Sequence, residues 1–418
     1  MDTTRTHHEI DWSCLWDVLV IGAGPAGSVA AFEFAKQGLR VLVVDQSQFP
    51  RHKVCGGCLN HVAIQNLQDM GLSSVLSSLS GRVTRQLVLA SNQHRLSLDI
   101  PHGVAVSRFQ LDQALTIAAE NAGVLFVSNV RAKPNQSIVQ ADHLEVPCET
   151  STGPKRILTR LVVLANGLPN DSWDDPKLQT KVARKSRMGL GTVAFDFPKE
   201  YQEGHIYMAV GRSGYVGLTR IEGNRLSIAA AVDPMRLKAA ESPGKLCREI
   251  VADAGLTVAE SMFQGDWRGT VALTRWRRQP ASHRIFAIGD AAGYIEPFTG
   301  AGMSWAIIAA RAVVPFAVAG VENWQPSLAA NWSSQHRKLL VSEQRKCRWL
   351  TRCLRSPLLL KSSMQAIDIF PSLGRQAVKF LTGSTNDVFS LGNWNSSPTA
   401  SGEARGRIEN VHRTAVRE

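Results

Sequence analysis

The feature that most constrains this sequence is a glycine-rich turn, GAGPAG, set between two short apolar runs. Residues 17–21 (DVLVI) and 40–44 (RVLVV) have the composition of buried strands, and residues 28–37 between them have that of a helix. Gly38 follows as a helix stop. A strand, a glycine turn, a helix and a second strand within ~30 residues predict a right-handed βαβ unit.

Each glycine of the turn has a separate use in holding a dinucleotide. Gly22 permits the tight turn, Gly24 lets the backbone approach a pyrophosphate, and Gly27 allows close packing of the helix. The phosphates would then meet the positive N-terminal end of that helix. Asp45 closes the second strand, where a carboxylate can accept hydrogen bonds from both ribose hydroxyls. The turn predicts a dinucleotide site without separating FAD from NAD.

A second motif, far along the chain, favours a flavin. Residues 284–290 (RIFAIGD) are typical of a strand that runs into Gly289 and Asp290, and a helix is expected from residue 301. A helix that opens at Gly300 and Gly302 aims unpaired amides outward, where they would stabilise negative charge on a reduced flavin ring.

Two further segments complete the pattern: residues 49–57 (FPRHKVCGG) and the helix start at residues 107–112 (SRFQLD). Over residues 17–345 the chain resembles the superfamily of FAD-dependent aromatic hydroxylases, geranylgeranyl reductases and flavin halogenases, and the geranylgeranyl reductase-like branch most. In the simpler interpretation of the helix start, Ser107 caps the helix and Asp112 is an exposed acid. The cofactor-binding residues that the turn and the resemblance imply are Gly22, Gly24, Pro25, Ala26, Gly27, Asp45, Gln46, Arg51, Lys53, Cys55, Gly56, Gly57, Arg108, Val130, Gly289, Asp290, Pro297, Gly300, Gly302 and Met303.

The chain also departs from the patterns of this superfamily. Residues 165–167 read Ala-Asn-Gly where the hydroxylases have Ala-Asp-Gly, which weakens inferences about a nicotinamide dinucleotide at this turn. Residues 214–219 lack the tryptophans and proline of the halogenase motif, and no counterpart of the halogenase lysine is found, so halogenation is disfavoured. Ala301 stands where the prenyl reductases have a glutamate.

Three functions therefore remain open. The favoured one is a monooxygenase that hydroxylates a small apolar or aromatic molecule with reduced FAD and dioxygen, because that reaction demands least from protein acids. The alternatives are an ene-reductase of geranylgeranyl reductase type and a non-catalytic escort protein that reuses the FAD fold. NADPH or NADH is the expected reductant in either enzyme. The candidate catalytic side chains, each with packing as the simpler interpretation, are Cys55, His205, Tyr207, Tyr215 and Tyr294.

The expected fold class is α/β (α+β): a Rossmann-type FAD-binding domain with an inserted antiparallel-sheet substrate domain and C-terminal helices. The FAD-binding domain is assigned to residues 1–82, 102–182 and 265–345, and the substrate domain to residues 83–101 and 183–264. Residues 346–381 are expected to be a helical segment. Residues 382–418, rich in Gly, Ser, Thr and Asn, are expected to be disordered.

The charge and the cysteines of the sequence indicate which partners and which cellular compartment to expect. The net charge is +12, and much of it lies in residues 337–361. A solvated helix face is the simpler interpretation of this run, weak peripheral membrane contact beside Trp349 is the alternative, and no motif supports nucleic acid. Seven irregularly spaced cysteines and the absence of a secretory signal predict reduced thiols, no metal site and a cytoplasmic protein. The longest apolar stretch, residues 305–320, is expected to be a buried helix.

Overall fold

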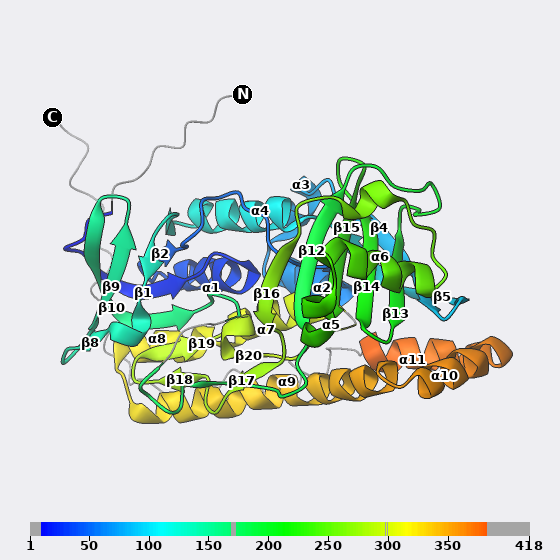
Figure 1. Cartoon of the computed structure of the whole chain (residues 1–418). Helices are drawn as coiled ribbons and strands as arrows, with labels where there is room; N and C mark the ends of the chain where they lie inside the picture. Colours follow the sequence, from blue (N-terminus) through cyan, green and yellow to red (C-terminus); the bar gives the residue numbers. More distant parts are fainter. Residues whose placement is uncertain (1–9, 169–172, 297, 299, 383–418) are drawn as a thin grey trace. The chain divides into compact units, whose positions relative to one another are not determined.

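The computed structural model describes residues 10–168, 173–296, 298 and 300–382, and two sheets dominate it (Figure 1). The first sheet joins segments from the two ends of the chain, as the fold class predicts. Its strands follow the order β18, β19, β10, β1, β2, β6. Their bounds are Ala281–Ser282, Ile285–Ala287, Gly153–Leu164, Leu15–Ile21, Val41–Val44 and Leu125–Val127.

The predicted βαβ unit is confirmed at the centre of this sheet. β1 pairs in parallel with β2, and α1 (Pro25–Lys36) forms the crossover between them. β1 also pairs in parallel with β10, which in turn pairs in parallel with β19. Residues 285–287 therefore lie two strands away from residues 15–21, although 263 residues (22–284) separate them. This parallel order carries the carboxyl ends of β1, β10 and β19 to one edge of the sheet, where ligands bind in open α/β sheets.

The second sheet follows the order β16, β12, β15, β14, β13, β4, β5, β3. Their bounds are Arg268–Ala272, Met188–Ala194, Arg225–Val232, Gly214–Ile221, His205–Gly211, Arg82–Ser91, His94–Ala105 and Cys58–Leu59. The prediction of a purely antiparallel sheet is wrong at one place, because β4 and β13 pair in parallel. They come from distant parts of the chain, so no hairpin turn forces them to run in opposite directions.

The second sheet also includes β3 and β16, from ranges that the sequence division gives to the FAD-binding domain. β16 pairs with β12 at one edge of the sheet, and β3 pairs with β5 at the other edge. These two strands lie outside the strands that sequence patterning identifies. The domain boundaries themselves stay a prediction, since residues up to 382 form one compact unit.

The long apolar stretch forms two helices, α7 (Gly302–Ala312) and α8 (Val314–Glu322). Residues 302–322 are long and apolar enough to cross a membrane, with a mean hydropathy of 1.7, but 72% of their most apolar window is buried in the protein. α7 packs against α1 and against α2 (His61–Asp69). The prediction of a buried segment is confirmed, and the single helix expected there is replaced by two that meet at Val313, next to Pro315.

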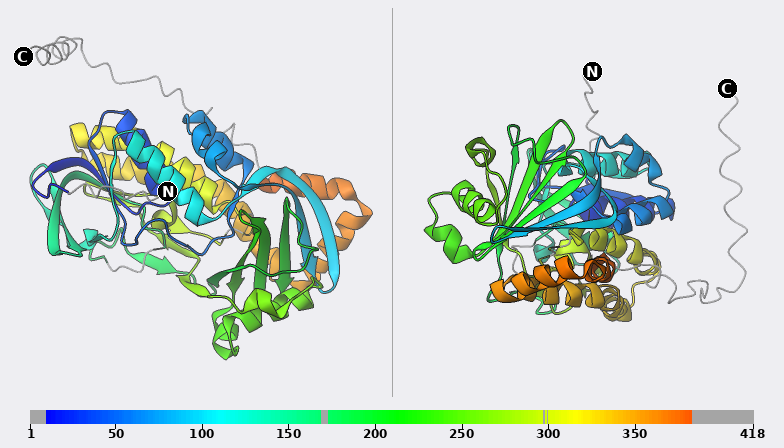
Figure 2. Two further views of the ribbon diagram at one scale, coloured as in Figure 1. Left: turned by 90° about the horizontal axis from the view of Figure 1, so that it is seen from above. Right: turned by 90° about the vertical axis from the view of Figure 1, so that its right-hand side faces the viewer.

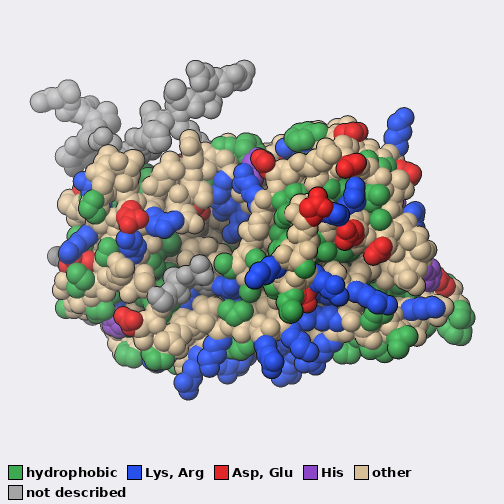
Figure 3. Space-filling view, in the orientation of Figure 1, with side chains coloured by type: hydrophobic (Ala, Val, Ile, Leu, Met, Phe, Trp, Pro, Cys, Tyr) green, Lys and Arg blue, Asp and Glu red, His purple; other side chains and the backbone are tan. Residues whose placement is uncertain are grey.

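Three helices end the described chain: α9 (Pro326–Leu354), α10 (Pro357–Ile369) and α11 (Pro371–Thr382). α9 runs from the first sheet towards the second, and α11 contacts β5 (Figure 2). In the view of Figure 3, Lys and Arg side chains gather along the lower edge, over α9. Of the tail expected to be disordered, residues 383–418 lie outside the described residues.

The remaining elements are short or peripheral. The other strands are β7 (Arg131–Ala132), β8 (Ile138–Val139), β9 (Leu144–Thr150), β11 (Thr180–Val182), β17 (Arg275–Arg277) and β20 (Gly293–Tyr294). The other helices are α3 (Ser73–Ser78), α4 (Arg108–Asn121), α5 (Pro234–Ala239) and α6 (Pro243–Asp253).

Candidate active site

The glycine turn sits at the carboxyl ends of β1 and β10, and its geometry requires glycine. Gly22 has φ +103°, and its N–H donates to the carbonyl oxygen of Val44 at 2.7 Å. A Cβ atom on Gly22 would lie 2.5 Å from the carbonyl oxygen of Ala165, and one on Gly27 would lie 1.8 Å from that of Gly22. Both positions therefore exclude any side chain.

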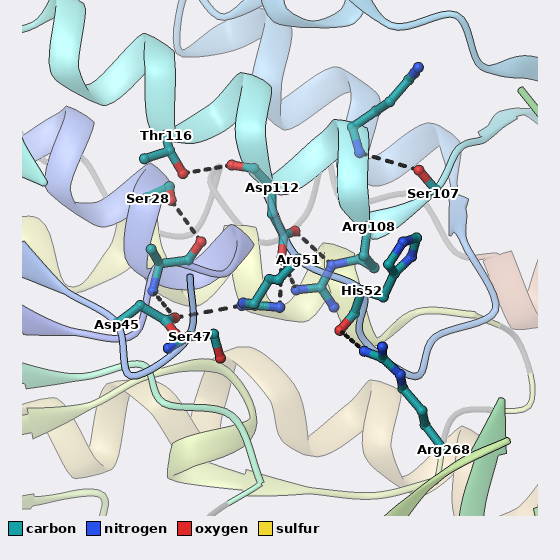
Figure 4. Close-up of polar contacts among 12 residues, drawn as sticks. Ser28, Asp45, Ser47, Arg51, His52, Ser107, Arg108, Asp112, Thr116 and Arg268 are labelled. Carbon is teal, nitrogen blue, oxygen red and sulfur yellow. Dashed lines mark hydrogen bonds and ion pairs between the residues drawn. The ribbon is translucent and has the colours of Figure 1, made fainter. Parts of the chain in front are cut away.

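Asp45 is held rigidly beside this turn. Its Oδ2 accepts a hydrogen bond from the Ala23 amide at 2.9 Å, and its Oδ1 accepts one from the Ser47 amide, also at 2.9 Å (Figure 4). The side chain is buried, and Arg51 Nη2 lies 3.7 Å from Oδ2. A fixed carboxylate at the end of β2 suits the binding of ribose hydroxyls.

Two arginines face the turn, and one buried carboxylate holds both. Asp112 is fully buried on α4 and accepts from Arg108 Nε at 2.6 Å and Arg108 Nη2 at 2.7 Å, while Arg51 Nη1 lies 3.2 Å away (Figure 4). Burial opposes the charge of Arg108, but Asp112 outweighs it and raises the pKa of the guanidinium. The interpretation of Asp112 as an exposed acid is wrong, because α4 packs on α1 with the face that carries Asp112 and Arg108 buried.

The arginines are placed where a diphosphate would lie. A Cβ atom on Gly24 would lie 3.2 Å from Arg108 Nη2 and 3.7 Å from Arg51 Nη2. Charge-assisted hydrogen bonds from guanidinium groups to phosphate are among the stronger polar contacts in proteins. The bare backbone of Gly24 and the two cations therefore fit the pyrophosphate of a dinucleotide.

Lys53 and Asp290 bring the two distant motifs together. Asp290 follows β19, and Lys53 follows β2, yet each perturbs the ionisation of the other. Burial, helped by Arg108 and Arg51, lowers the pKa of Lys53, while burial raises the pKa of Asp290 against the pull of Lys53 and Arg108. The Lys53 side chain lines a large cavity that begins at the glycine turn.

One cavity of about 1550 Å³ extends from the glycine turn to the C-terminal helices. The sequence-predicted residues that line it are Gly24, Pro25, Ala26, Gln46, Lys53, Cys55, Gly56, Gly57, Arg108, Tyr215, Asp290, Tyr294, Gly300, Gly302 and Met303. The other predicted residues that the structure describes are not among those lining the cavity, although Asp45 and Arg51 lie directly beside the glycine turn at its cofactor end; they are Gly22, Gly27, Asp45, Arg51, Val130 and Gly289. Pro297 lies outside the described residues.

Two candidate catalytic residues do not reach this cavity. His205 and Tyr207 line a separate pocket of about 230 Å³ on the second sheet. Tyr207 donates its hydroxyl to the carbonyl oxygen of Glu200 at 2.7 Å, and His205 Nδ1 lies 3.0 Å from that of Glu203. Both side chains are engaged by backbone and have no access to the cofactor motifs, so the structure does not bring them into the site.

A buried acid in the cavity wall, Glu296, was not predicted from the sequence. Glu296 is 1% exposed, and its Oε1 accepts from Arg187 Nη1 at 3.0 Å. The Arg187 guanidinium lies 5.4 Å from the centre of the Tyr215 ring, and burial, together with Glu296, raises the pKa of Tyr215 well above its usual range. An acid inside the apolar run GYIEPF was the available signal for Glu296. Arg187, 109 residues away, had none.

None of the cysteines forms a disulfide bond, and some of them line the cavity. All seven are free in the structure. Cys55 lines the cavity, and its sulfur accepts a hydrogen bond from the Gly57 amide at 3.5 Å. Burial raises the pKa of Cys58 to about 12, which disfavours its thiolate.

The glycine turn, the clamped arginines and the cavity that reaches the start of α7 together fit FAD, and comparison with known proteins decides the family. A sequence model described as "FAD binding domain" matches residues 16–315. The chain belongs to this FAD-binding family. It is a FAD-dependent oxidoreductase of the superfamily that includes monooxygenases and reductases.

Among curated relatives, the menaquinone reductase of Mycobacterium tuberculosis is 34% identical over 146 residues, which are 32% of this chain and 35% of that protein. The match thus spans about a third of that relative. The digeranylgeranylglycerophospholipid reductase of Methanocaldococcus jannaschii is 24% identical over 69% of this chain and 73% of its own length. A flavoprotein/dehydrogenase structure from Cytophaga hutchinsonii superposes with a TM-score of 0.74 at 18% identity, over 90% of this chain and 96% of that one, which shows the shared fold.

Proposed function

We propose that this FAD-dependent oxidoreductase reduces a carbon–carbon double bond in a long, apolar, isoprenoid-like lipid. The observation that carries the proposal is the size and lining of the cavity. Its volume of about 1550 Å³ exceeds the ~300–1,000 Å³ of a site for one drug-sized ligand, so it has room for the flavin end of FAD and a second extended ligand.

The part of the cavity beyond the cofactor motifs is lined mostly by apolar side chains. β4 and β5 contribute Leu87, Leu89, Leu96 and Leu98, and α9, α10 and α11 line the far end with further apolar side chains. Burial of hydrocarbon against such a wall is favourable, whereas a polar substrate would find few hydrogen-bond partners there. It therefore suits a chain of repeating apolar units better than the small aromatic molecule that the sequence analysis favoured.

The relatives support the same choice. Their names assign to those proteins the reduction of menaquinone and of digeranylgeranylglycerophospholipid. Solved structures of the same fold include enzymes with other activities, and their low identity supports the fold alone. Oxygenation, the function first favoured, therefore becomes the second candidate.

Different residues would bind the cofactor and donate the proton in such a reduction. Bound FAD would supply the hydride once it is reduced. Asp45 would bind the ribose, Arg51 and Arg108 the diphosphate, and the amides at the start of α7 would lie near the ring. Tyr215 is the candidate proton donor because it lines the cavity and carries its proton at neutral pH, and the Arg187 guanidinium, which opposes the rise in its pKa, would stabilise the phenolate that proton transfer leaves. One alkene carbon would receive the hydride and the other the phenolic proton, which solvent would later replace.

An anaerobic turnover experiment separates reduction from oxygenation. The flavin-loaded protein, reduced with dithionite, is mixed without oxygen with menaquinone or a geranylgeranyl lipid in detergent. We expect the flavin absorbance to return and, after air has reoxidised any quinol, the lipid to keep two added hydrogens by mass spectrometry, because air reverses reduction of a quinone ring but not of an alkene. An oxygenated product that forms only in air would replace this proposal with monooxygenation, and a purified protein that holds no flavin would favour the escort function.

A second measurement tests the proton donor. Tyr215→Phe keeps the ring and removes the hydroxyl, so we expect flavin reoxidation by the lipid to slow by about 10²–10⁴-fold, the usual contribution of a general acid. Tyr207→Phe is the matched control, because that hydroxyl lies outside the cavity. An unchanged rate in Tyr215→Phe would remove Tyr215 from the mechanism.

A further inference from the structure

The far end of the cavity opens among apolar side chains that are themselves exposed. Four of its lining residues are large and more than two-fifths exposed: Trp349 (58%), Leu359 (56%), Leu373 (41%) and Phe380 (52%). They come from the end of α9, from α10 and from α11. We call this rim the cavity mouth. Exposure at the mouth costs hydrophobic free energy unless another apolar phase covers it.

Exposed apolar side chains continue beyond the mouth, on α10 and at its junction with α11. Leu358, Ile369 and Phe370 are 79%, 69% and 60% exposed, and none of them lines the cavity. In the view of Figure 3, hydrophobic side chains gather at the lower right, over α10 and α11, next to the Lys and Arg side chains along α9. The apolar surface is thus wider than a substrate entrance requires.

The charge around this surface is strongly positive. Between residues 343 and 382 the chain has eight Lys and Arg residues against two acids, Glu343 and Asp368. Arg348, Arg352, Lys361 and Arg375 are exposed. Basic side chains that flank exposed Trp, Phe and Leu are the combination that holds a helix in the interface of an anionic bilayer.

We propose that the mouth formed by α9, α10 and α11 docks on an anionic lipid bilayer, with Leu358, Ile369 and Phe370 inserted and the basic residues at the headgroups. The membrane contact predicted from residues 337–361 is thereby extended through α11. An apolar chain could then pass from the bilayer into the cavity without crossing water. This entry route rests on the proposed function, whereas the docking itself does not.

The two are tested by separate readouts on the flavin-loaded full chain. Co-sedimentation uses vesicles of phosphatidylcholine alone and of phosphatidylcholine with phosphatidylglycerol. We expect binding to the anionic vesicles that weakens as salt rises. Phe370→Asp should lower this binding by on the order of tenfold or more, since a charge replaces an aromatic ring that is proposed to insert into the bilayer. Phe195→Asp, which changes an even more exposed phenylalanine (75%) away from the mouth, should leave this binding unchanged.

Three results would overturn the docking proposal. They are no sedimentation with anionic vesicles at low salt, equal losses in Phe370→Asp and Phe195→Asp, and a dimer that Phe370→Asp dissociates while neither form binds vesicles. The last result would assign the surface to a second copy of the chain. Turnover of a short, soluble prenyl compound is measured in parallel, so that failure of the proposed function is seen separately from failure to bind lipid.

Discussion

The two ends of the cavity hold their shape in different ways. At the cofactor end, buried charges pair with one another: Asp112 holds Arg108 and Arg51, and the backbone approaches closely at Gly22. At the mouth, the wall consists of apolar side chains on three helices, several of them exposed. Directional hydrogen bonds fix positions to fractions of an ångström, whereas apolar contacts tolerate rearrangement.

This difference matches the two ligands that the cavity is proposed to bind. FAD is polar at its diphosphate and always the same molecule, so a rigid, charged site suits it. An isoprenoid chain has no polar group along its length, and a deformable apolar wall suits it. Changes at the cofactor end should therefore be more damaging than changes at the mouth, and the following experiments test that order.

The largest effect is expected at Asp112. Asp112→Ala leaves two buried guanidinium groups without their carboxylate, and we expect a loss of about 3–5 kcal/mol in the free energy of unfolding together with loss of flavin. Asp368 on α10 is the matched control, because it pairs with His94 at 2.6 Å on the surface. Asp368→Ala should cost less than ~1 kcal/mol. Denaturant titration measures both, and equal losses would contradict the comparison.

A close second is the turn itself. Gly22→Ala forces a Cβ to 2.5 Å from a carbonyl oxygen at a positive φ, and we expect FAD affinity to fall by about 3 kcal/mol, or on the order of a hundredfold. In Gly38→Ala the φ is also positive (+78°), but nothing lies within 4 Å of the added Cβ. Flavin titration of the two variants separates crowding from backbone strain. A matching loss in Gly38→Ala would show that crowding is not the cause.

Substitution of His336 tests whether the first half of α9 is as tightly packed as the cofactor end of the cavity. It is buried beside Trp332, and burial lowers its pKa to about 4 from 6.5. The unfolded chain therefore takes up the proton first, so stability is complete above pH 6.5 and falls as the pH drops towards 4. We expect a loss of about 2 kcal/mol between pH 7 and pH 5. His336→Leu should flatten this part of the stability curve, and an unchanged slope would exclude His336 as its source.

The smallest effect is expected from narrowing the cavity near the mouth. Ala366 on α10 lines the cavity, so Ala366→Phe should raise KM for long prenyl substrates by about tenfold while short ones are affected little. Ser362→Phe, on the same helix but outside the lining, is the control. Flavin reoxidation by substrates of increasing length gives the readout. A KM increase that is independent of chain length would argue against an extended substrate in this part of the cavity.

The parts of the site that the sequence predicts are those encoded locally. The turn at Gly22, the end of β2 at Asp45 and the strand before Asp290 each occupy a few consecutive residues, so periodicity and residue type identify them. The burial of Asp112 was not predicted because it depends on how α4 packs. The ion pair between Glu296 and Arg187 was not predicted either, because a buried ion pair between distant residues leaves no local pattern.

The sequence alone determined the βαβ unit and the FAD family, since short-range geometry and the shape of glycine dictate them. Only the tertiary structure decided that β4 pairs in parallel with β13 and that His205 faces a separate pocket. It also decided that α10 and α11 surround an opening to the cavity. These features depend on contacts between residues far apart in the chain, and such contacts are selected by packing of the whole core rather than by any neighbouring residues.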